Sequence, residues 1–351
     1  MRPRMPALDL VAPFLSEMDE SGVYSNFGPL VKRLEAAYAS HFNVPEDQVV
    51  TVSSATLGLE GAIRTTDVDT WLVPDFTFPA TGLAVLEADR ELVLVDVDEQ
   101  TWELPESVAS TVGSRGGVIA VMAFGAPIDL ARWHGTETLI IDAAASLGSS
   151  SLDLASLPAS WSVVFSLHAT KVLPAGEGGV VVFGDAERAS LFRAWSNFGF
   201  RGARVSTVEG TNAKMSEIHA AYGLASLSNW ESERNEWLEP LQRARLISRQ
   251  LNLPTSRQDT LGVHPYWVVD LGNADRAQSA ARALESEGFG HRFWWPSLHT
   301  MPAFTGVSQH GDLSQSKRLS TSVLGLPMYR GLGLSHLDHV AEILVSELAK
   351  R

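Results

Sequence analysis

Short apolar runs alternate with amphipathic segments over the first half of the chain, and this alternation constrains the fold more than any other feature. The runs consist mostly of valine, isoleucine, leucine and aromatic residues, at 49–52, 71–73, 92–97, 118–124, 138–141, 161–165 and 179–183. Between them, amphipathic segments such as 57–64 and 80–87 predict helices. Strands that are apolar along their whole length are typical of a parallel sheet buried on both faces. We therefore predict an α/β protein with a mostly parallel central sheet covered by helices.

The sequence changes in character near residue 215. Two long helices are predicted at 215–237 and 238–251, followed by a strand at 266–271 and a helix at 276–287. A last helix is predicted from Ser335, because Ser335 and Asp338 have the spacing of a capping box. The 351 residues are enough for one large domain and a smaller one. We predict a large domain at residues 1–236 and a smaller α+β domain at 237–351.

Charge and composition restrict the partners and the location. The net charge of -14 argues against nucleic acid or an anionic membrane surface as the main partner. No apolar stretch approaches the roughly 20 residues of a membrane-spanning helix, and the first residues lack the pattern of a cleavable signal, so a cytoplasmic protein is expected. Cysteine is absent, which excludes disulfides and thiolate metal sites. His336 and His339 have too few potential ligands around them to predict a metal site.

Lys171 is one of five lysines, and its surroundings are unusual. It follows the apolar strand at 161–165, and no acidic residue lies within five positions on either side. Apolar surroundings disfavour the charged form of an amine, and the neutral amine is the form that Schiff-base chemistry requires. A lysine that extends from a strand end into solvent would give the same pattern. The residues alone leave both interpretations open.

Asp142 and the segment 53–59 each follow a predicted strand. Ligands of parallel α/β sheets bind at the carboxyl ends of strands, and a carboxylate there could keep the pyridinium nitrogen of pyridoxal phosphate protonated. An Asp after a strand is equally typical of a helix N-cap. The small and hydroxyl residues at 53–59 begin a helix, where backbone N–H groups could bind a phosphate. A plain Ser/Thr cap would look the same.

In this order, the motifs resemble the DegT/DnrJ/EryC1/StrS family of sugar aminotransferases, which are fold-type I pyridoxal-phosphate enzymes with an aspartate-aminotransferase-like large domain. The resemblance covers nearly the whole chain. Its most specific part is the segment 165–171 together with Glu177-Gly178-Gly179. The other matching segments are 28–29 with 34–35, 74–81, 95–98, 212–218, 295–299 and 326–328.

The resemblance implies a role for each matching residue. Lys171 would bind pyridoxal phosphate as a Schiff base and move the proton, and Asp142 would pair with the pyridine nitrogen. The remaining implied contacts are Phe78 against the cofactor ring, Ser54, Ala55, Thr56 and Ser166 at the phosphate, Asn212 from the neighbouring subunit of a homodimer, and His168 beside the sugar.

One cofactor-binding position departs from the family pattern. Ala145 stands where the family usually has a Gln that contacts the cofactor's 3-hydroxyl group, although Ser146 could replace it in part. Lys171 is retained, which argues against the family's dehydratase branch, where a histidine replaces this lysine.

The resemblance also suggests a substrate. His168 and Glu177-Gly178-Gly179 resemble the enzymes that act at C-4, so we expect amino transfer from L-glutamate to a nucleoside-diphosphate 4-keto-6-deoxyhexose, for polysaccharide or antibiotic sugar biosynthesis. Candidates for substrate contacts are the basic residues Arg201, Lys214 and Arg292, together with Trp294, Trp295 and His299. For Arg201 and Lys214, an ordinary solvated surface position fits the sequence equally well. A C-3 keto sugar, a cyclitol ketone, or a non-catalytic regulatory protein that binds the cofactor are the alternatives.

Overall fold

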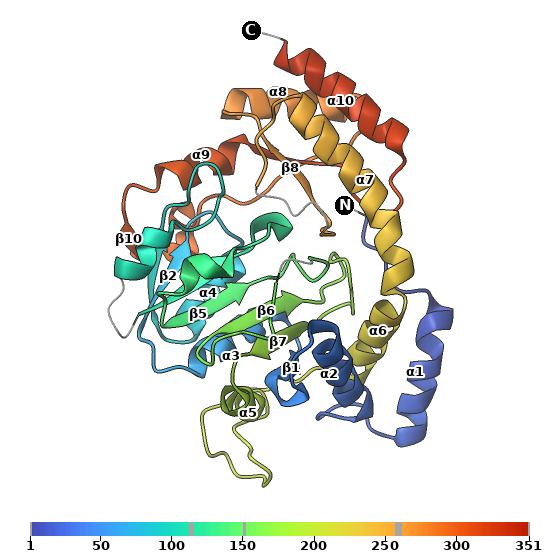
Figure 1. Cartoon of the computed structure of the whole chain (residues 1–351), viewed down its shortest axis with the longest axis vertical. Coiled ribbons are helices and arrows are strands. Elements are labelled where there is room, and N and C mark those ends of the chain that lie inside the picture. The colour runs from blue at the N-terminus through green and yellow to red at the C-terminus, as the bar shows by residue number, and fades with distance from the viewer. Residues whose placement is uncertain (1, 112–115, 150–151, 257–261, 350–351) are drawn as a thin grey trace.

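The computed structural model describes residues 2–111, 116–149, 152–256 and 262–349, and these contain a large sheet of eight strands (Figure 1). The strand order is β1-β7-β6-β5-β4-β2-β3-β10. All neighbours from β6 to β10 in this order are parallel, whereas β7 is antiparallel to both β6 and β1. The mostly parallel sheet is therefore confirmed. The strands are β1 (Val49–Val52), β2 (Thr70–Pro74), β3 (Glu91–Val95), β4 (Gly116–Val121), β5 (Thr138–Asp142), β6 (Ser162–Ser166), β7 (Gly179–Phe183) and β10 (Ser308–His310).

Helices cover both faces of this sheet. Successive side chains of a strand point to opposite faces, so Val163 and Phe165 of β6 pack in one core, whereas Val164 packs in the other. The first core includes α1 (Leu8–Ser21), α2 (Pro29–Phe42) and α6 (Glu217–Ser228). The second includes α3 (Ala55–Arg64), α4 (Pro79–Glu87) and α5 (Ala186–Trp195). Burial on both faces explains why the strands are apolar along their whole length.

The C-terminal part forms a second, smaller sheet with its own helices. Its strands are β8 (Trp267–Asp270), β9 (Arg292–Phe293) and β11 (Val323–Leu326), paired antiparallel in the order β8-β11-β9. The helices of this part are α8 (Ala274–Ser286), α9 (Ser314–Ser322) and α10 (Leu334–Leu348). This agrees with the predicted smaller α+β part. One strand of the region, β10, instead joins the edge of the large sheet beside β3.

The prediction of one helix at 215–237 and another at 238–251 is wrong. The first helix, α6, ends at Ser228, and a single helix α7 (Trp230–Gln250) follows after Asn229. Asn229 has φ -101° and ψ 3°, outside the helical range, although no Gly or Pro marks the break. Helix α7 extends from α6 to α8 and α10 (Figure 1). The predicted domain boundary at 236/237 therefore falls inside a continuous helix, and the division into domains stays a prediction.

The predicted capping box at the last helix is also wrong. Helix α10 begins at Leu334 after Gly333, which has no side chain to cap it, so Ser335 lies inside the helix. Asp338 instead accepts a hydrogen bond from Nε of Arg243 on α7, at 2.6 Å. The Asp338 carboxylate therefore forms a tertiary ion pair with Arg243 and does not cap the helix. Among the described residues, no helix is long and apolar enough to cross a membrane.

Candidate active site

A cavity of about 560 Å³ lies at the carboxyl ends of the central strands, with walls from both parts of the chain. The large sheet contributes Asp142 at the end of β5 and Ser166 at the end of β6. The C-terminal part contributes Tyr266, at the residue before β8, and the segment 292–296. Carboxyl ends of neighbouring parallel strands meet at one edge of a sheet, which is where such folds bind their ligands.

Lys171 reaches this cavity from the connection between β6 and β7. The connection is fixed by backbone hydrogen bonds from Leu167 to Gly178 (2.9 Å) and from Ala169 to Gly176 (2.8 Å). Gly176 has φ +91° and Gly178 has φ +152°, values that an L side chain rarely adopts. The Lys171 ammonium donates a hydrogen bond to the hydroxyl of Tyr266 at 3.0 Å. The lysine is therefore held in the cavity rather than extended into solvent.

Asp142 is buried at the base of the cavity, with 6% of its surface exposed. Its Oδ2 accepts a hydrogen bond from Thr81 Oγ1 at 2.8 Å, and its Oδ1 accepts one from the N–H of Ala144 at 3.2 Å. Burial raises the pKa of the Asp142 carboxyl, against the opposing effect of these hydrogen bonds and of the charge on Lys171. Residues 143–149 form turns rather than a helix. The N-cap interpretation of Asp142 is therefore wrong.

The start of α3 forms another wall of the cavity. Ser54, Ala55 and Thr56 all line it, and the Ser54 hydroxyl also caps the helix by accepting a hydrogen bond from the N–H of Leu57 at 3.3 Å. A Cβ atom on Gly179 of β7 would lie 3.0 Å from the backbone N of Ala55, so glycine permits this close approach. Helix N-terminal N–H groups and hydroxyls, with Ser166 across from them, are a donor set that suits a phosphate.

Aromatic rings form the remaining wall. Phe78, at the N-cap of α4, is 59% exposed and meets Trp295 edge-on at 5.8 Å between ring centroids. Trp295 stacks on Phe124 at 5.2 Å, and Trp294 packs against Tyr266 at 5.0 Å. Phe78, Trp294 and Trp295 were predicted as cofactor or substrate contacts, and all three line the cavity. Phe124 and Tyr266 were not predicted, because they come from other, distant segments of the chain.

Ala145 lines the cavity as expected, but Ser146 does not. The Ser146 side chain is buried, with 1% of the residue exposed. The prediction that Ser146 takes over part of the contact of the missing Gln is therefore not supported. The wall at position 145 carries no polar side chain.

The predicted substrate residues fall into two groups. His168 lines the cavity, with its Nε2 3.6 Å from Glu177 Oε1, and Arg292 lines it from β9. Asn212, Arg201 and Lys214 do not line it. They lie on or beside the segment between α5 and α6, which projects from the body of the molecule (Figure 1).

Asn212 and Lys214 contact one another outside the cavity. The Lys214 Nζ donates to Asn212 Oδ1 at 2.6 Å and lies 4.4 Å from the centroid of the Phe198 ring. Partial burial lowers the pKa of Lys214. Arg201 is exposed. Within one chain, then, these residues do not reach the site that the resemblance assigns to them.

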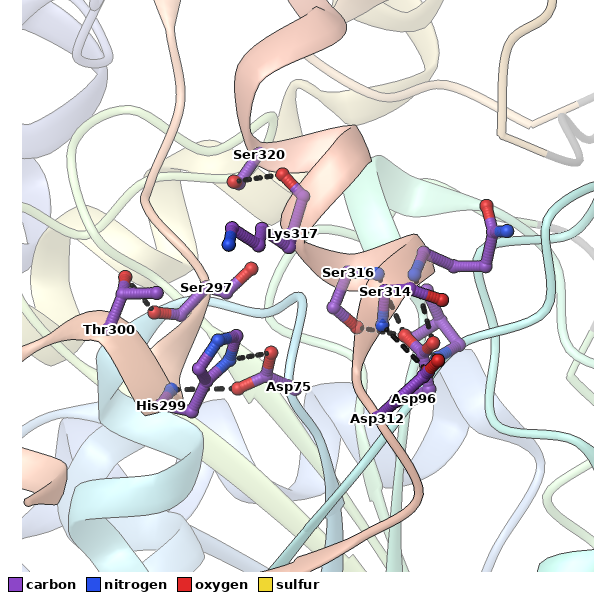
Figure 2. A network of polar contacts seen from close by, with 12 residues as sticks. Asp75, Asp96, Ser297, His299, Thr300, Asp312, Ser314, Ser316, Lys317 and Ser320 are labelled. Carbon is purple, nitrogen blue, oxygen red and sulfur yellow. Dashed lines mark hydrogen bonds and ion pairs between the residues drawn. The ribbon is translucent and has the colours of Figure 1, made fainter.

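His299 is not in the cavity wall, contrary to the expectation for a substrate residue. Figure 2 shows it turned toward Asp75, which follows β2. The carboxylate accepts from the backbone N–H of His299 at 2.8 Å, and its other oxygen lies 2.6 Å from the His299 Nδ1. Nearby, Asp96 after β3 accepts from the N–H groups of Gln315 and Ser316 at 2.9 and 2.7 Å (Figure 2). These carboxylates fasten the C-terminal part to the strand ends beside the cavity.

The cavity thus brings together a lysine amine, a buried carboxylate and a set of donors that suits a phosphate. The family model named "DegT/DnrJ/EryC1/StrS aminotransferase family" matches residues 11–345, so the chain belongs to that family and is an aminotransferase with pyridoxal phosphate as its cofactor.

Individual relatives resemble the chain over nearly its full length. The dTDP-4-amino-4,6-dideoxy-D-glucose transaminase of Shigella dysenteriae is 24% identical, over 98% of this chain and 97% of that protein. The dTDP-3-amino-3,4,6-trideoxy-alpha-D-glucose transaminase of Streptomyces venezuelae is 28% identical, over 93% and 91%. The structure of DesI, solved in the presence of its TDP-sugar product, is 29% identical with a TM-score of 0.86, over 100% of this chain and 93% of that one.

Proposed function

We propose that the protein transfers an amino group from L-glutamate to the keto group of a sugar linked to a nucleoside diphosphate. The observation that carries this proposal is the meeting of Lys171, Asp142, Phe78 and the α3 N-terminus around one cavity. In it, Lys171 would bind the cofactor and Asp142 would pair with the pyridine nitrogen. Phe78 would contact the ring, and Ser54, Ala55, Thr56 and Ser166 would hold the phosphate.

The cofactor, when bound, supplies an electron sink that lowers the barrier to removing a proton from the substrate carbon. Lys171 Nζ would then take that proton and return it, as a general base followed by a general acid. The groups around Lys171 would keep the substrate and the cofactor in a fixed orientation during this proton transfer. Asp142, fixed by Thr81 and Ala144, would present its carboxylate in one orientation.

The proposed acceptor is a 4-keto-6-deoxyhexose, which would place the enzyme in polysaccharide or antibiotic sugar biosynthesis. His168 and Glu177, which resemble the residues of C-4 enzymes, both line the cavity. Arg292 would offer a positive charge to the diphosphate from the cavity wall. The two transaminase relatives bear names with amines at C-4 and at C-3. A C-3 keto sugar therefore remains the second candidate, and a cyclitol ketone the third.

Two measurements test this proposal. Borohydride reduction followed by peptide mapping should find the pyridoxyl group on Lys171, whereas a label on another lysine would contradict the cofactor assignment.

Nucleotide-linked keto sugars should then be screened with L-glutamate, and the new amine located by NMR. A new amine at C-3 would contradict only the proposed site of amination on the sugar, C-4, and not the transfer to a nucleotide-linked sugar. Equal rates with a free keto sugar or a cyclitol ketone would exclude the nucleotide sugar.

We also propose a homodimer in which the two active sites share residues. Asn212, Arg201 and Lys214 lie outside the cavity of their own chain, on or beside the projecting segment between α5 and α6. In a two-fold dimer, the same segment of each chain would reach the partner's site. Asn212 would then contact the phosphate, and the two basic residues would contact the diphosphate of the substrate.

A further inference from the structure

The hydroxyl of Tyr266 touches the reactive end of Lys171, although the two residues are 95 positions apart. The distance from Lys171 Nζ to the Tyr266 hydroxyl is 3.0 Å. The nearby carboxylate of Asp142 is already bonded to Thr81 and to the N–H of Ala144. The hydroxyl group that accepts from the lysine nitrogen thus comes from the C-terminal part.

Tyr266 is itself held in place. Only 7% of the residue is exposed, and its ring packs edge-on against Phe124 at 6.0 Å and against Trp294 at 5.0 Å. Its neighbour Trp267 begins β8, which is paired along its length with β11. A ring confined on several sides places its hydroxyl within a small volume, as a positioning group must.

Position 145, in the wall beside Tyr266, carries no polar side chain. Ala145 packs against the same aromatic cluster as Tyr266, and Ser146 is buried outside the cavity. The small residue at 145 is thus consistent with a wall in which the phenol provides the hydrogen bond.

We infer that Tyr266 is a positioning residue for Lys171: its hydroxyl accepts a hydrogen bond from the lysine nitrogen and holds it for proton transfer. The inference rests on the proposed attachment of the cofactor to Lys171. Losing a hydrogen bond to the protonated nitrogen would favour the unprotonated form. Besides Tyr266, the titratable or charged groups that line the two cavities around Lys171 are Asp142, His168, Glu177 and Arg292 in the first, and Arg2, Arg4, Glu233, Tyr329 and Arg330 in the second. All of these are unchanged by a Tyr266 substitution.

The test is Tyr266→Phe in the cofactor-loaded enzyme, with Tyr38→Phe as the matched control. Tyr38 is also buried, at 0% exposed, and its hydroxyl has no hydrogen-bond partner among the described residues, so the control removes the same atom away from the site. The visible absorption of the bound cofactor is titrated with pH. Its midpoint should fall by about one pH unit in Tyr266→Phe, as expected for one hydrogen bond to a charged group. It should not move in Tyr38→Phe.

A second measurement separates positioning from binding. Tyr266→Phe should lower kcat on the order of tenfold and leave the KM for glutamate nearly unchanged, because the lysine nitrogen acts in proton transfer. Retained melting temperature would show that the ring still packs.

The pH midpoint and the borohydride label together decide between the outcomes. An unchanged midpoint, or one that rises, would overturn the inference, since the hydroxyl would then not stabilise the protonated nitrogen. If borohydride finds no pyridoxyl group on Lys171 of the wild type, the proposed function fails and the inference fails with it. A wild type labelled at Lys171 with an unshifted Tyr266→Phe would overturn the inference alone.

Discussion

Asp142 is a carboxylate with only 6% of its surface exposed, and this burial should make the cofactor-free protein less stable. Burial raises the folded-state pKa above the ordinary value of 3.8. The folded protein therefore binds this proton more tightly than the unfolded chain. The resulting stabilisation is fully present below the unfolded pKa, and it is lost as the pH rises through the raised folded pKa.

Asp142→Asn should accordingly be more stable than the wild type at neutral pH when both lack cofactor. The asparagine carries no charge, so the difference in melting temperature should grow as the pH rises from about 4 and then level off. Transamination should fall by orders of magnitude, because the neutral amide cannot keep the pyridine nitrogen protonated. Asp89→Asn, at a side chain 90% exposed, is the control for charge removal. A variant with normal turnover would contradict the role of Asp142.

Residues that directly follow a strand or begin a helix could be predicted, because the apolar pattern itself locates them. This applies to Asp142 and Ser54, which line the cavity. Ser166 also lines it, but it was expected from the family resemblance alone. Tyr266 was missed, since its contact with Lys171 depends on the packing of distant segments. His299 was predicted as a substrate contact together with Trp294 and Trp295, yet its ring is bonded to Asp75.

At the scale of elements, a carboxylate from α6 caps a helix that cannot cap itself. Helix α2 begins after Gly28, which has no capping side chain. Glu217, fully buried at the start of α6, accepts hydrogen bonds from the N–H groups of Leu30 and Val31 at 2.7 and 3.0 Å. A Cβ on Gly28 would lie 2.6 Å from the Glu217 side chain. The glycine is therefore needed for the carboxylate to reach the positive helix end.

Glu217→Gln should lower the free energy of unfolding by about 1–3 kcal/mol. The amide keeps the shape but replaces one acceptor oxygen with a donor, which leaves a buried N–H of α2 without a partner. Urea unfolding of the variant, compared with that of Glu20→Gln at an exposed position of α1, measures the difference. Equal midpoints for the two variants would show that α2 does not depend on this cap.

Helices and strands could be predicted from the sequence where their own residues carry a clear apolar pattern. The strands buried on both faces were predicted to within a few residues. The break at Asn229 was not, because the helical pattern continues through it without a Gly or Pro. Strands β9 and β10 have two and three residues, too few for any periodicity. Strand β7 is antiparallel to β1, which lies about 130 positions earlier, and a pairing over that distance leaves no local pattern.

At the scale of the whole molecule, the shared active site can be tested with two defective chains. Lys171→Ala and Asn212→Ala should each be poorly active alone. If Asn212 acts across the interface, a mixed dimer has one intact site, formed by Lys171 of one chain and Asn212 of the other. Refolding the two variants together should therefore restore activity, up to about a quarter of the wild type for random pairing.

The matched control is a mixture of Lys171→Ala with Asp142→Asn. Both residues line the cavity of one chain, so every site in the mixed dimer keeps one defect and no activity should return. If the Lys171→Ala and Asn212→Ala mixture also stays inactive, although the chains associate, then Asn212 serves its own chain. An active monomer in sedimentation would exclude the shared site altogether.

Each outermost strand of the large sheet pairs with a strand that is distant in the sequence. Strand β1 pairs with β7 at one edge, and β10, at residues 308–310, pairs with β3 at the other. During synthesis, β3 therefore leaves the ribosome more than 200 residues before its edge partner, a wait of at least about 10 s at 5–20 residues per second. Until then its unpaired edge could recruit another chain. We therefore expect nascent chains that stop before residue 308 to associate with chaperones more strongly than those that include β10.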